Sequence, residues 1–230
     1  MKKSLLVVLC VLFAVSFAFA GGGKQSDGGS APAPSSAPVV LPSGPVMSTG
    51  PHEEQASPAS DLSLTEDELA KIKAGKHKAA ICFHYSGDDW SAAQEKGLRD
   101  QFGRMGIEVV AVTSANFNAA QQKADIETVL ALNPDAIVSI PVDVVSAESV
   151  FKDAAKKGVK IVFMDNCPDN MVAGTDYVAV VSADNYGNGV AAAEVMGEKL
   201  GGKGKIAMVY HDANFFVTNQ RDDAFRKTIR

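Results

Sequence analysis

The sequence predicts an α/β protein built on a doubly wound parallel sheet, and three features of the chain indicate it. From Lys78 onward, apolar runs alternate with amphipathic segments. The apolar runs are continuous stretches of Val, Ile, Ala and Phe, which is typical of strands buried on both faces. Short connections that often contain glycine separate the segments. Repeated strand and helix units of this kind predict parallel strands, right-handed crossovers and helices on both faces of the sheet.

The elements follow in order along the chain. A short helix is expected at 66–74, because Thr65 and Glu68 form a capping box and Gly75 ends the pattern. Strands are expected at 79–84, 106–113, 135–140, 159–165, 177–183 and 205–211. Helices are expected at 89–104, 119–132, 146–157, 188–200 and 218–230, where apolar residues recur at helical spacing.

Two segments precede this region. Residues 1–20 carry Lys2 and Lys3, a nearly continuous apolar stretch and a small-residue cleavage pattern, which predicts an export signal peptide. Cys10 leaves a lipoprotein open, and an uncleaved membrane anchor is a second alternative. Residues 21–62 are rich in Gly, Ser, Ala and Pro, so we expect a disordered linker there. The expected location is therefore periplasmic or otherwise extracytoplasmic.

The overall composition excludes some partners. The 230 residues hold 22 Lys and Arg against 27 Asp and Glu, a formal net charge of −5. Nucleic acids and anionic membranes bind basic patches, so we expect neither as a partner. The sequence lacks the zinc-protease, serine-hydrolase and P-loop motifs. We therefore expect no metal, no other cofactor and no enzymatic activity.

Polar and aromatic side chains gather where the expected strands end. The carboxyl ends of parallel strands meet at one edge of an open sheet, and ligands bind outside that edge. The candidate ligand-binding residues are His84, Tyr85, Asp88, Asp89, Trp90, Asp143, Asp165, Asn166, Phe215 and Arg221. Asn116, Phe117, His211 and Asn214 follow other strands at the same edge. The pattern predicts a binding site, because loops carry function when a rigid scaffold positions them.

These side chains suit a ligand with many hydroxyl groups. Asp, Asn and Arg can each bond two hydroxyls, and the apolar C–H faces of a sugar pack on aromatic rings. Trp90 is the only tryptophan in the chain, and packing beneath the loop is its alternative role. Asp88 or Asp89 is expected to cap the following helix. A solvated helix charge is the alternative for Arg221.

One segment also has a second interpretation, which is nucleotide binding. Gly187, Gly189 and Ala192 form a Gly-x-Gly-x-x-Ala pattern, and Asp212 follows about twenty residues later. The first glycine comes several residues after the strand, whereas a dinucleotide site needs it in the tight turn. Close helix packing explains the small residues equally well.

Four stretches of the folded region resemble a known family. They are AAICFHYSGDDWSAAQEKGLRDQF, VFMDN, VSADNYGNGVAAAEVMGEKLGGKGKIAMVYH and TNQRDDAF. The family they resemble is the ribose-binding type of periplasmic sugar-binding proteins of ABC transporters. In this order, the stretches are similar to that family's first strand and ligand loop, its fourth strand, its crossover into the second lobe and the start of the helix that carries a ligand-binding Arg. The resemblance implies the type I periplasmic-binding-protein fold. It further implies that His84, Asp88, Trp90, Asp165, Asn166 and Arg221 face the ligand.

The resemblance also implies a division into lobes. After a lead-in helix in 63–76, residues 77–181 are expected to form a nearly complete N-terminal ligand-binding lobe. Residues 182–230 are expected to begin a second lobe, which implies a C-terminal truncation. The family commonly has Asn-Pro and paired Phe where this chain has Asp88, Asp89, Trp90 and Ser91, and Asp-Arg where it has Asp165 and Asn166. These departures favour a hexose, a polyol or an amine-bearing ligand at least as well as ribose.

The expected function is extracytoplasmic capture of a sugar or sugar-like small molecule for an ABC-type importer. The expected partners are a small sugar or polyol and the membrane permease of the transporter, and we expect a monomer. The alternatives are a nucleotide-binding, Rossmann-like oxidoreductase and a sugar-sensing ectodomain without transport.

Overall fold

The computed structural model describes residues 45–211 and 214–230. The expected export signal (1–20) and the first part of the expected linker (21–44) lie outside the described residues, as does Asp212. Within the described ranges, no helix combines the length and the apolar character needed to span a bilayer.

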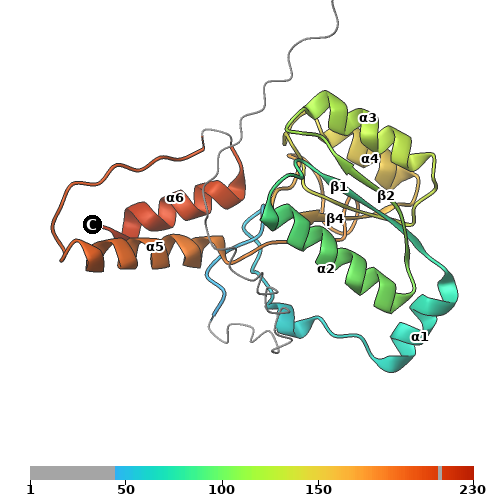
Figure 1. Ribbon diagram of the computed structural model, residues 1–230, viewed down its shortest axis with the longest axis horizontal. Coiled ribbons are helices and arrows are strands. Elements are labelled where there is room, and N and C mark those ends of the chain that lie inside the picture. Colours follow the sequence, from blue (N-terminus) through green and yellow to red (C-terminus); the bar gives the residue numbers. More distant parts are fainter. Residues whose placement is uncertain (1–44, 212–213) are drawn as a thin grey trace, which may run out of the picture. The chain divides into compact units, whose positions relative to one another are not determined.

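A five-stranded parallel sheet forms the centre of the described chain (Figure 1). Its strands are β1 (Lys78–Phe83), β2 (Glu108–Ser114), β3 (Ala136–Ser139), β4 (Lys160–Met164) and β5 (Ala179–Val181). They lie in the order β2-β1-β3-β4-β5, and every neighbouring pair is parallel. The strand order therefore reverses between β1 and β3, which is where open α/β sheets bind ligands.

Helices cover both faces of this sheet (Figure 1). The helices are η1 (Ala59–Asp61), α1 (Glu66–Gly75), α2 (Asp89–Met105), α3 (Ala119–Leu130), α4 (Glu148–Lys156), α5 (Asn185–Lys199) and α6 (Phe216–Thr228). Ala80 and Cys82 of β1 face the core formed with α3 and α4, whereas Ile81 and Phe83 face the core formed with α2. Successive strand residues point to opposite faces, so this division is what a strand buried on both sides requires. The predicted doubly wound α/β class is confirmed.

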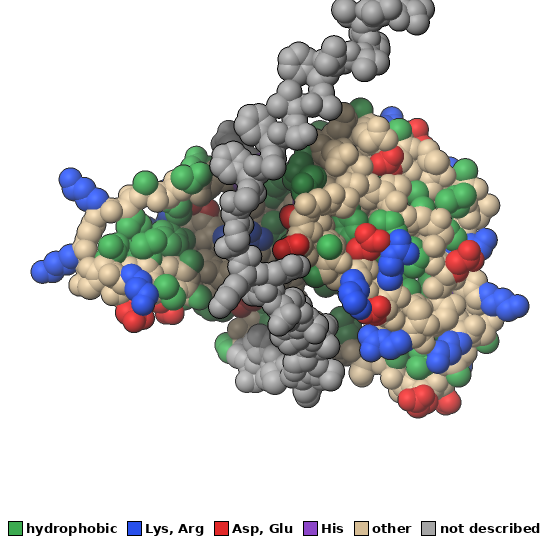
Figure 2. Space-filling model, in the orientation of Figure 1, with side chains coloured by type: hydrophobic (Ala, Val, Ile, Leu, Met, Phe, Trp, Pro, Cys, Tyr) green, Lys and Arg blue, Asp and Glu red, His purple; other side chains and the backbone are tan. Residues whose placement is uncertain are grey.

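Local sequence signals set the first helix ends. Thr65 caps α1, and the reciprocal capping box with Glu68 is present. Asp88 caps α2 by accepting a hydrogen bond of 2.8 Å from the Ser91 amide. The surface of α2 carries ion pairs such as Arg99–Glu95, and Figure 2 shows basic and acidic side chains intermingled on the face in view.

The Gly-x-Gly pattern lies inside α5 and not in a turn before it. A side chain at Gly189 would meet the Arg221 carbonyl oxygen and, at 2.7 Å, the Ala224 Cβ atom of α6. Only a residue without a Cβ allows this approach of the two helices. Helix packing therefore accounts for Gly189, and the structure offers no tight glycine turn of the kind that holds a dinucleotide at this point.

The strand expected at 205–211 is not formed, and this prediction was wrong. The residues have no regular secondary structure, and Val209 is 97% exposed. A strand is stabilised by hydrogen bonds to a neighbouring strand, and no strand pairs with this segment among the described residues. Val195 and Met196 of α5 and Leu200, which follows the helix, are exposed as well. Figure 2 shows hydrophobic side chains gathered around this helix.

Part of the segment expected to be a linker makes defined contacts. Ser48 is buried, and its hydroxyl donates to Asp184 Oδ1 at 2.8 Å while accepting from the Tyr186 amide at 2.9 Å. His52 Nε2 lies 3.0 Å from the carbonyl oxygen of Met171. Composition alone did not predict these contacts, because each one depends on a partner more than a hundred residues away.

Asp184→Asn is expected to make stability less sensitive to acid. Burial raises the pKa of Asp184, but hydrogen bonds from Gly187, Met47 and Ser48 outweigh burial and hold it below the ordinary value of 3.8. Because the folded pKa lies below the unfolded one, the carboxylate contributes stability above pH 3.8 that is lost as the pH falls through the folded pKa. Urea midpoints between about pH 5 and pH 2 should therefore fall more steeply for the wild type than for the variant. Glu127→Gln, at an exposed position on α3, is the control and should follow the wild type.

Candidate functional site

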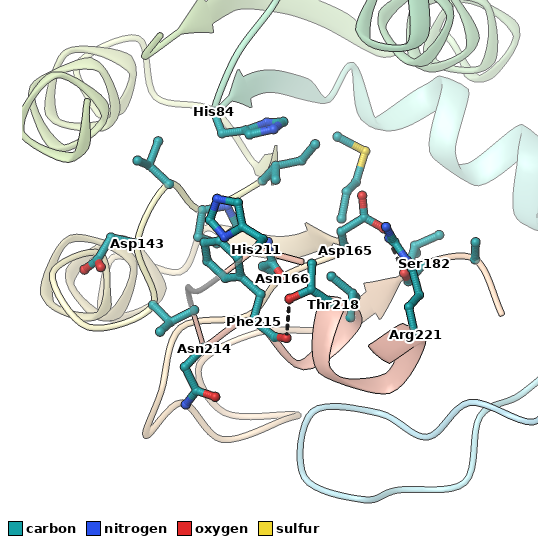
Figure 3. Close-up of a pocket in the computed structure, with 18 of the residues that line it drawn as sticks. His84, Asp143, Asp165, Asn166, Ser182, His211, Asn214, Phe215, Thr218 and Arg221 are labelled. Carbon is teal, nitrogen blue, oxygen red and sulfur yellow. Dashed lines mark hydrogen bonds between the residues drawn. The ribbon is translucent and has the colours of Figure 1, made fainter. Parts of the chain in front are cut away.

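A cavity of about 1240 Å³ lies at the carboxyl ends of the strands (Figure 3). Its walls come from the residues that follow β1 to β5 and from the beginning of α6. Among the expected site residues, the lining includes His84, Trp90, Asp143, Asp165, Asn166, Phe215 and Arg221. Residues up to 137 positions apart in the sequence thus share one cavity, as the parallel-sheet geometry requires.

Three of the expected residues are not part of the lining. Tyr85 stacks on Phe117, with ring centroids 5.0 Å apart and an interplanar angle of 12°. Asp88 caps α2, as one of the two adjacent aspartates was expected to do. Asp89 is the first residue of α2 and is exposed. Tyr85 and Asp88 therefore help to hold the loop after His84 and the beginning of α2, where Trp90 lies.

Two buried polar atoms of the lining have no hydrogen-bond partner within the described residues. They are Nδ1 of His84 and Oδ1 of Asn166. A buried polar atom without a partner is costly, and such atoms are rare in folded proteins. Burial also lowers the pKa of His84 from 6.5, against opposing effects of Asp165 and Asp88, so the imidazole is neutral at pH 7. Hydroxyl groups can satisfy both atoms, because a hydroxyl donates and accepts.

The two carboxylates of the cavity are each held by one oxygen. Asp143 Oδ1 accepts from the Ser146 amide at 2.6 Å and from the Val145 amide at 3.2 Å. Hydrogen bonds from Ser146 are the main reason that the pKa of Asp143 is lowered from 3.8. Asp165 Oδ1 accepts from the Ser182 hydroxyl at 2.8 Å. Both carboxylates are therefore oriented by neighbouring donors of the protein.

Asp165 and Phe117 adopt left-handed backbone conformations that side chains seldom accept. Their φ values are 58° and 60°. The amide of Asn166 also donates to the Met164 carbonyl at 2.8 Å, which closes a tight turn around Asp165. Backbone strain in such positions is held by the surrounding structure and clusters at ligand sites.

Aromatic rings lie at the cavity wall beside the polar groups. Trp90 is 46% exposed and Phe117 is 62% exposed. Phe117 meets His84 edge to face, with centroids 5.1 Å apart. Phe215 lies 5.7 Å from the ring of His211 (Figure 3). Exposed rings next to hydrogen-bonding groups match the alternating polar and apolar surface of a sugar.

The lining also contains polar residues that the sequence reasoning did not select. Ser182, Asn188 and Thr218 are among them. Ser182 directly follows β5, so the rule applied to the other strand ends would have identified it. Asn188 and Thr218 lie within α5 and α6, and no local signal separates them from ordinary helix residues. Among residues 45–211 and 214–230, no group of three His, Cys, Asp or Glu side chains is placed to hold a metal ion.

The described chain thus combines an α/β parallel-sheet fold with a cavity at the carboxyl ends of the strands. Residues 79–230 match the model of the periplasmic binding protein domain family, so the chain belongs to that family. It is 25% identical over 131 residues to the ribose import binding protein of Bacillus subtilis (strain 168), covering 57% of this chain and 41% of that protein.

Solved structures of sugar-binding proteins have the same fold. One is an ABC-transporter solute-binding protein from Agrobacterium vitis bound to α-D-tagatopyranose, with a TM-score of 0.60, 22% identity and coverage of 67% of this chain and 54% of that one. Another is the fructose-binding periplasmic domain of a hybrid two-component system, with a TM-score of 0.57, 20% identity and coverage of 66% and 49%. The chain thus spans about half the length of the proteins it matches.

Proposed function

We propose that this protein captures a sugar or polyol outside the cytoplasm for an ABC-type importer and carries out no chemical reaction on it. The observation that carries the proposal is the cavity in which buried His84 Nδ1 and Asn166 Oδ1 have no hydrogen-bond partner among the described residues and lie beside exposed rings. A neutral imidazole, an amide, two oriented carboxylates and the Arg221 guanidinium provide both donors and acceptors. A polyhydroxylated ligand can satisfy all of them at once.

The similar proteins support the same ligand class. Their names give ribose, tagatopyranose and fructose as ligands, and each of these is a sugar. We further infer that residues 77–181 act as the first ligand-binding lobe and residues 182–230 as the beginning of the second. Residues 1–20 would direct export, and the part of 21–62 before Met47 would act as the tether, because Met47, Ser48 and His52 contact the folded region.

A sugar panel tests the proposal, with Trp90 as the internal reporter. Trp90 lines the cavity and is the only tryptophan, so ligand binding is expected to change its fluorescence in a saturable way. The panel would contain D-ribose, D-allose, D-tagatose, D-fructose and myo-inositol, with NADH as the probe of the nucleotide alternative. Calorimetry would confirm each hit. Asp165→Asn should weaken binding by about tenfold or more, because a charge-assisted hydrogen bond is lost.

Asp100→Asn is the matched control, since Asp100 lies on the outer surface of α2 in an ion pair with Lys96. It should bind as the wild type does. If no sugar or polyol gives a saturable signal in either assay, or if NADH alone does, the proposed function is wrong.

Transport and sensing need a separate measurement, because both use the same kind of site. The relative from Bacillus subtilis is an import protein, whereas the fructose-binding domain belongs to a two-component system. We propose the importer role. Uptake of the identified sugar by cells should fall when the gene is deleted; unchanged uptake with a lost transcriptional response would instead indicate a sensor.

A further inference from the structure

Four polar side chains form a continuous hydrogen-bond relay that joins two charged residues of the cavity lining, Arg221 and Asp165. Arg221 Nε donates to Asn185 Oδ1 at 2.6 Å. Asn185 Nδ2 donates to Ser182 Oγ at 2.7 Å, and Ser182 Oγ donates to Asp165 Oδ1 at 2.8 Å. Figure 3 shows Asp165, Ser182 and Arg221 together at one side of the cavity. The relay thus starts at a guanidinium and ends at a carboxylate.

The relay has only one consistent direction. Asn185 Nδ2 also donates to the Ala183 carbonyl at 2.9 Å, so both of its protons are used and its amide cannot flip. Ser182 has a single hydroxyl proton, and because its oxygen accepts from Asn185 that proton goes to Asp165. Each donor therefore polarises the next one, and such chains are stronger than the sum of isolated hydrogen bonds.

The relay also crosses a junction between parts of the chain. Asp165 follows β4 of the sheet, and Ser182 lies in the crossover that leaves β5. Asn185 begins α5, and Arg221 belongs to α6, which packs closely on α5 at Gly189. Asn185 is 1% exposed. A polar side chain that is buried in this way destabilises the fold unless all of its polar atoms are hydrogen-bonded.

We propose that Asn185 and Ser182 are positioning residues for ligand binding. They hold the Arg221 guanidinium by Nε and the Asp165 carboxylate by Oδ1, which leaves the Nη groups and the second carboxylate oxygen for the ligand. This inference rests on the proposed function, because its purpose is to preorganise the two charged groups of the sugar site. A preorganised site binds more tightly, since less side-chain freedom is lost when the ligand enters.

A ligand-free measurement tests the relay itself. The Arg221 Nε–H proton, assigned by its loss in Arg221→Lys, should exchange with water about 10- to 100-fold faster in Asn185→Ala than in the wild type, because its acceptor is removed. Asn185→Asp keeps that acceptor and removes both donors, so it should keep the slow exchange. Equal exchange in the wild type and in Asn185→Ala would overturn the relay.

A binding measurement tests the positioning role. With the sugar from the panel that the wild type binds, Ser182→Ala should weaken binding about tenfold or more, whereas Ser182→Thr, which retains the hydroxyl, should restore most of the affinity. Ser182 is exposed, so this pair avoids the folding defect that Asn185→Ala could cause. Ser149→Ala, at an exposed position on α4, is the control and should bind as the wild type does.

The effects of Ser182→Ala and Asn185→Ala should not add in the double variant, because both interrupt one relay. Unchanged affinity in Ser182→Ala would overturn the positioning role, and so would failure of threonine to restore it. If the wild type bound no member of the panel, the proposed function and the positioning role would both fall. The exchange measurement would still decide whether the relay exists.

Discussion

Replacing Arg221 with alanine is expected to weaken sugar binding by about 100-fold. It should also lower thermal stability, because the buried Asn185 Oδ1 loses its donor. Among the described residues that line the cavity, Arg221 is the only Lys or Arg, and its Nε is the first donor of the relay through Asn185. Hydrogen bonds to charged groups contribute about 1.5–3 kcal/mol each. The loss of the guanidinium should therefore reduce the affinity for the sugar by one or two factors of ten. Lysine should recover part of the affinity, because it restores the charge but not the planar fork of donors.

Arg226→Ala is the matched control for this substitution. It lies on the same helix, pairs with Asp222 at 2.9 Å on the surface and does not line the cavity. Calorimetric titrations of both variants with the same sugar should show a large loss for Arg221→Ala and almost none for Arg226→Ala. Equal losses would mean that the charge of α6, and not a specific contact, supports binding.

The largest expected loss of stability comes from Phe151→Ala. Phe151 of α4 is fully buried and meets Phe163 of β4 edge to face, with centroids 4.9 Å apart. Truncating a buried phenylalanine removes apolar burial and leaves a cavity, which costs about 3–5 kcal/mol. Since native domains are stable by only about 5–15 kcal/mol, the variant should lose a large share of its free energy of unfolding.

Phe117→Ala is the control for this effect, because it deletes the same ring at a position that is 62% exposed. Urea unfolding followed by circular dichroism should show a much smaller shift for it. Its effect should instead appear in sugar binding, since Phe117 lines the cavity. If the two variants were equally unstable, the assignment of Phe151 to the core would be wrong.

Helix ends and strand positions were largely predictable because their signals are local. The capping box of Thr65 and Glu68 was expected, and so was a cap at Asp88 or Asp89, which the structure assigns to Asp88; each cap involves residues three apart. The apolar run that became β1 was recognised because its residues are buried on both faces, which leaves no polar alternation. The parallel arrangement followed from the alternation of strands and helices.

The sheet edge that carries the cavity was predictable to a similar extent, since topology alone brings the strand ends together. His84, Trp90, Asp143 and Asp165 were expected at that edge, and they line the cavity. The sequence could not show which of the neighbouring polar residues line the cavity and which do not. Asp88 is bound to the end of its own helix, and only the three-dimensional contacts distinguish it from a residue that faces a ligand.

Sequence patterns therefore settled the class of fold, the capping box of α1 and the sheet edge that carries the cavity, because these depend on residues a few positions apart and on a general property of parallel sheets. Tertiary contacts alone decided the strand order, the failure of 205–211 to form a strand and the pairing of Ser48 with Asp184. They also decided the relay from Arg221 to Asp165. Each of these depends on partners that are distant along the chain. The local sequence around either partner does not show that the hydrogen bond or the buried contact will form.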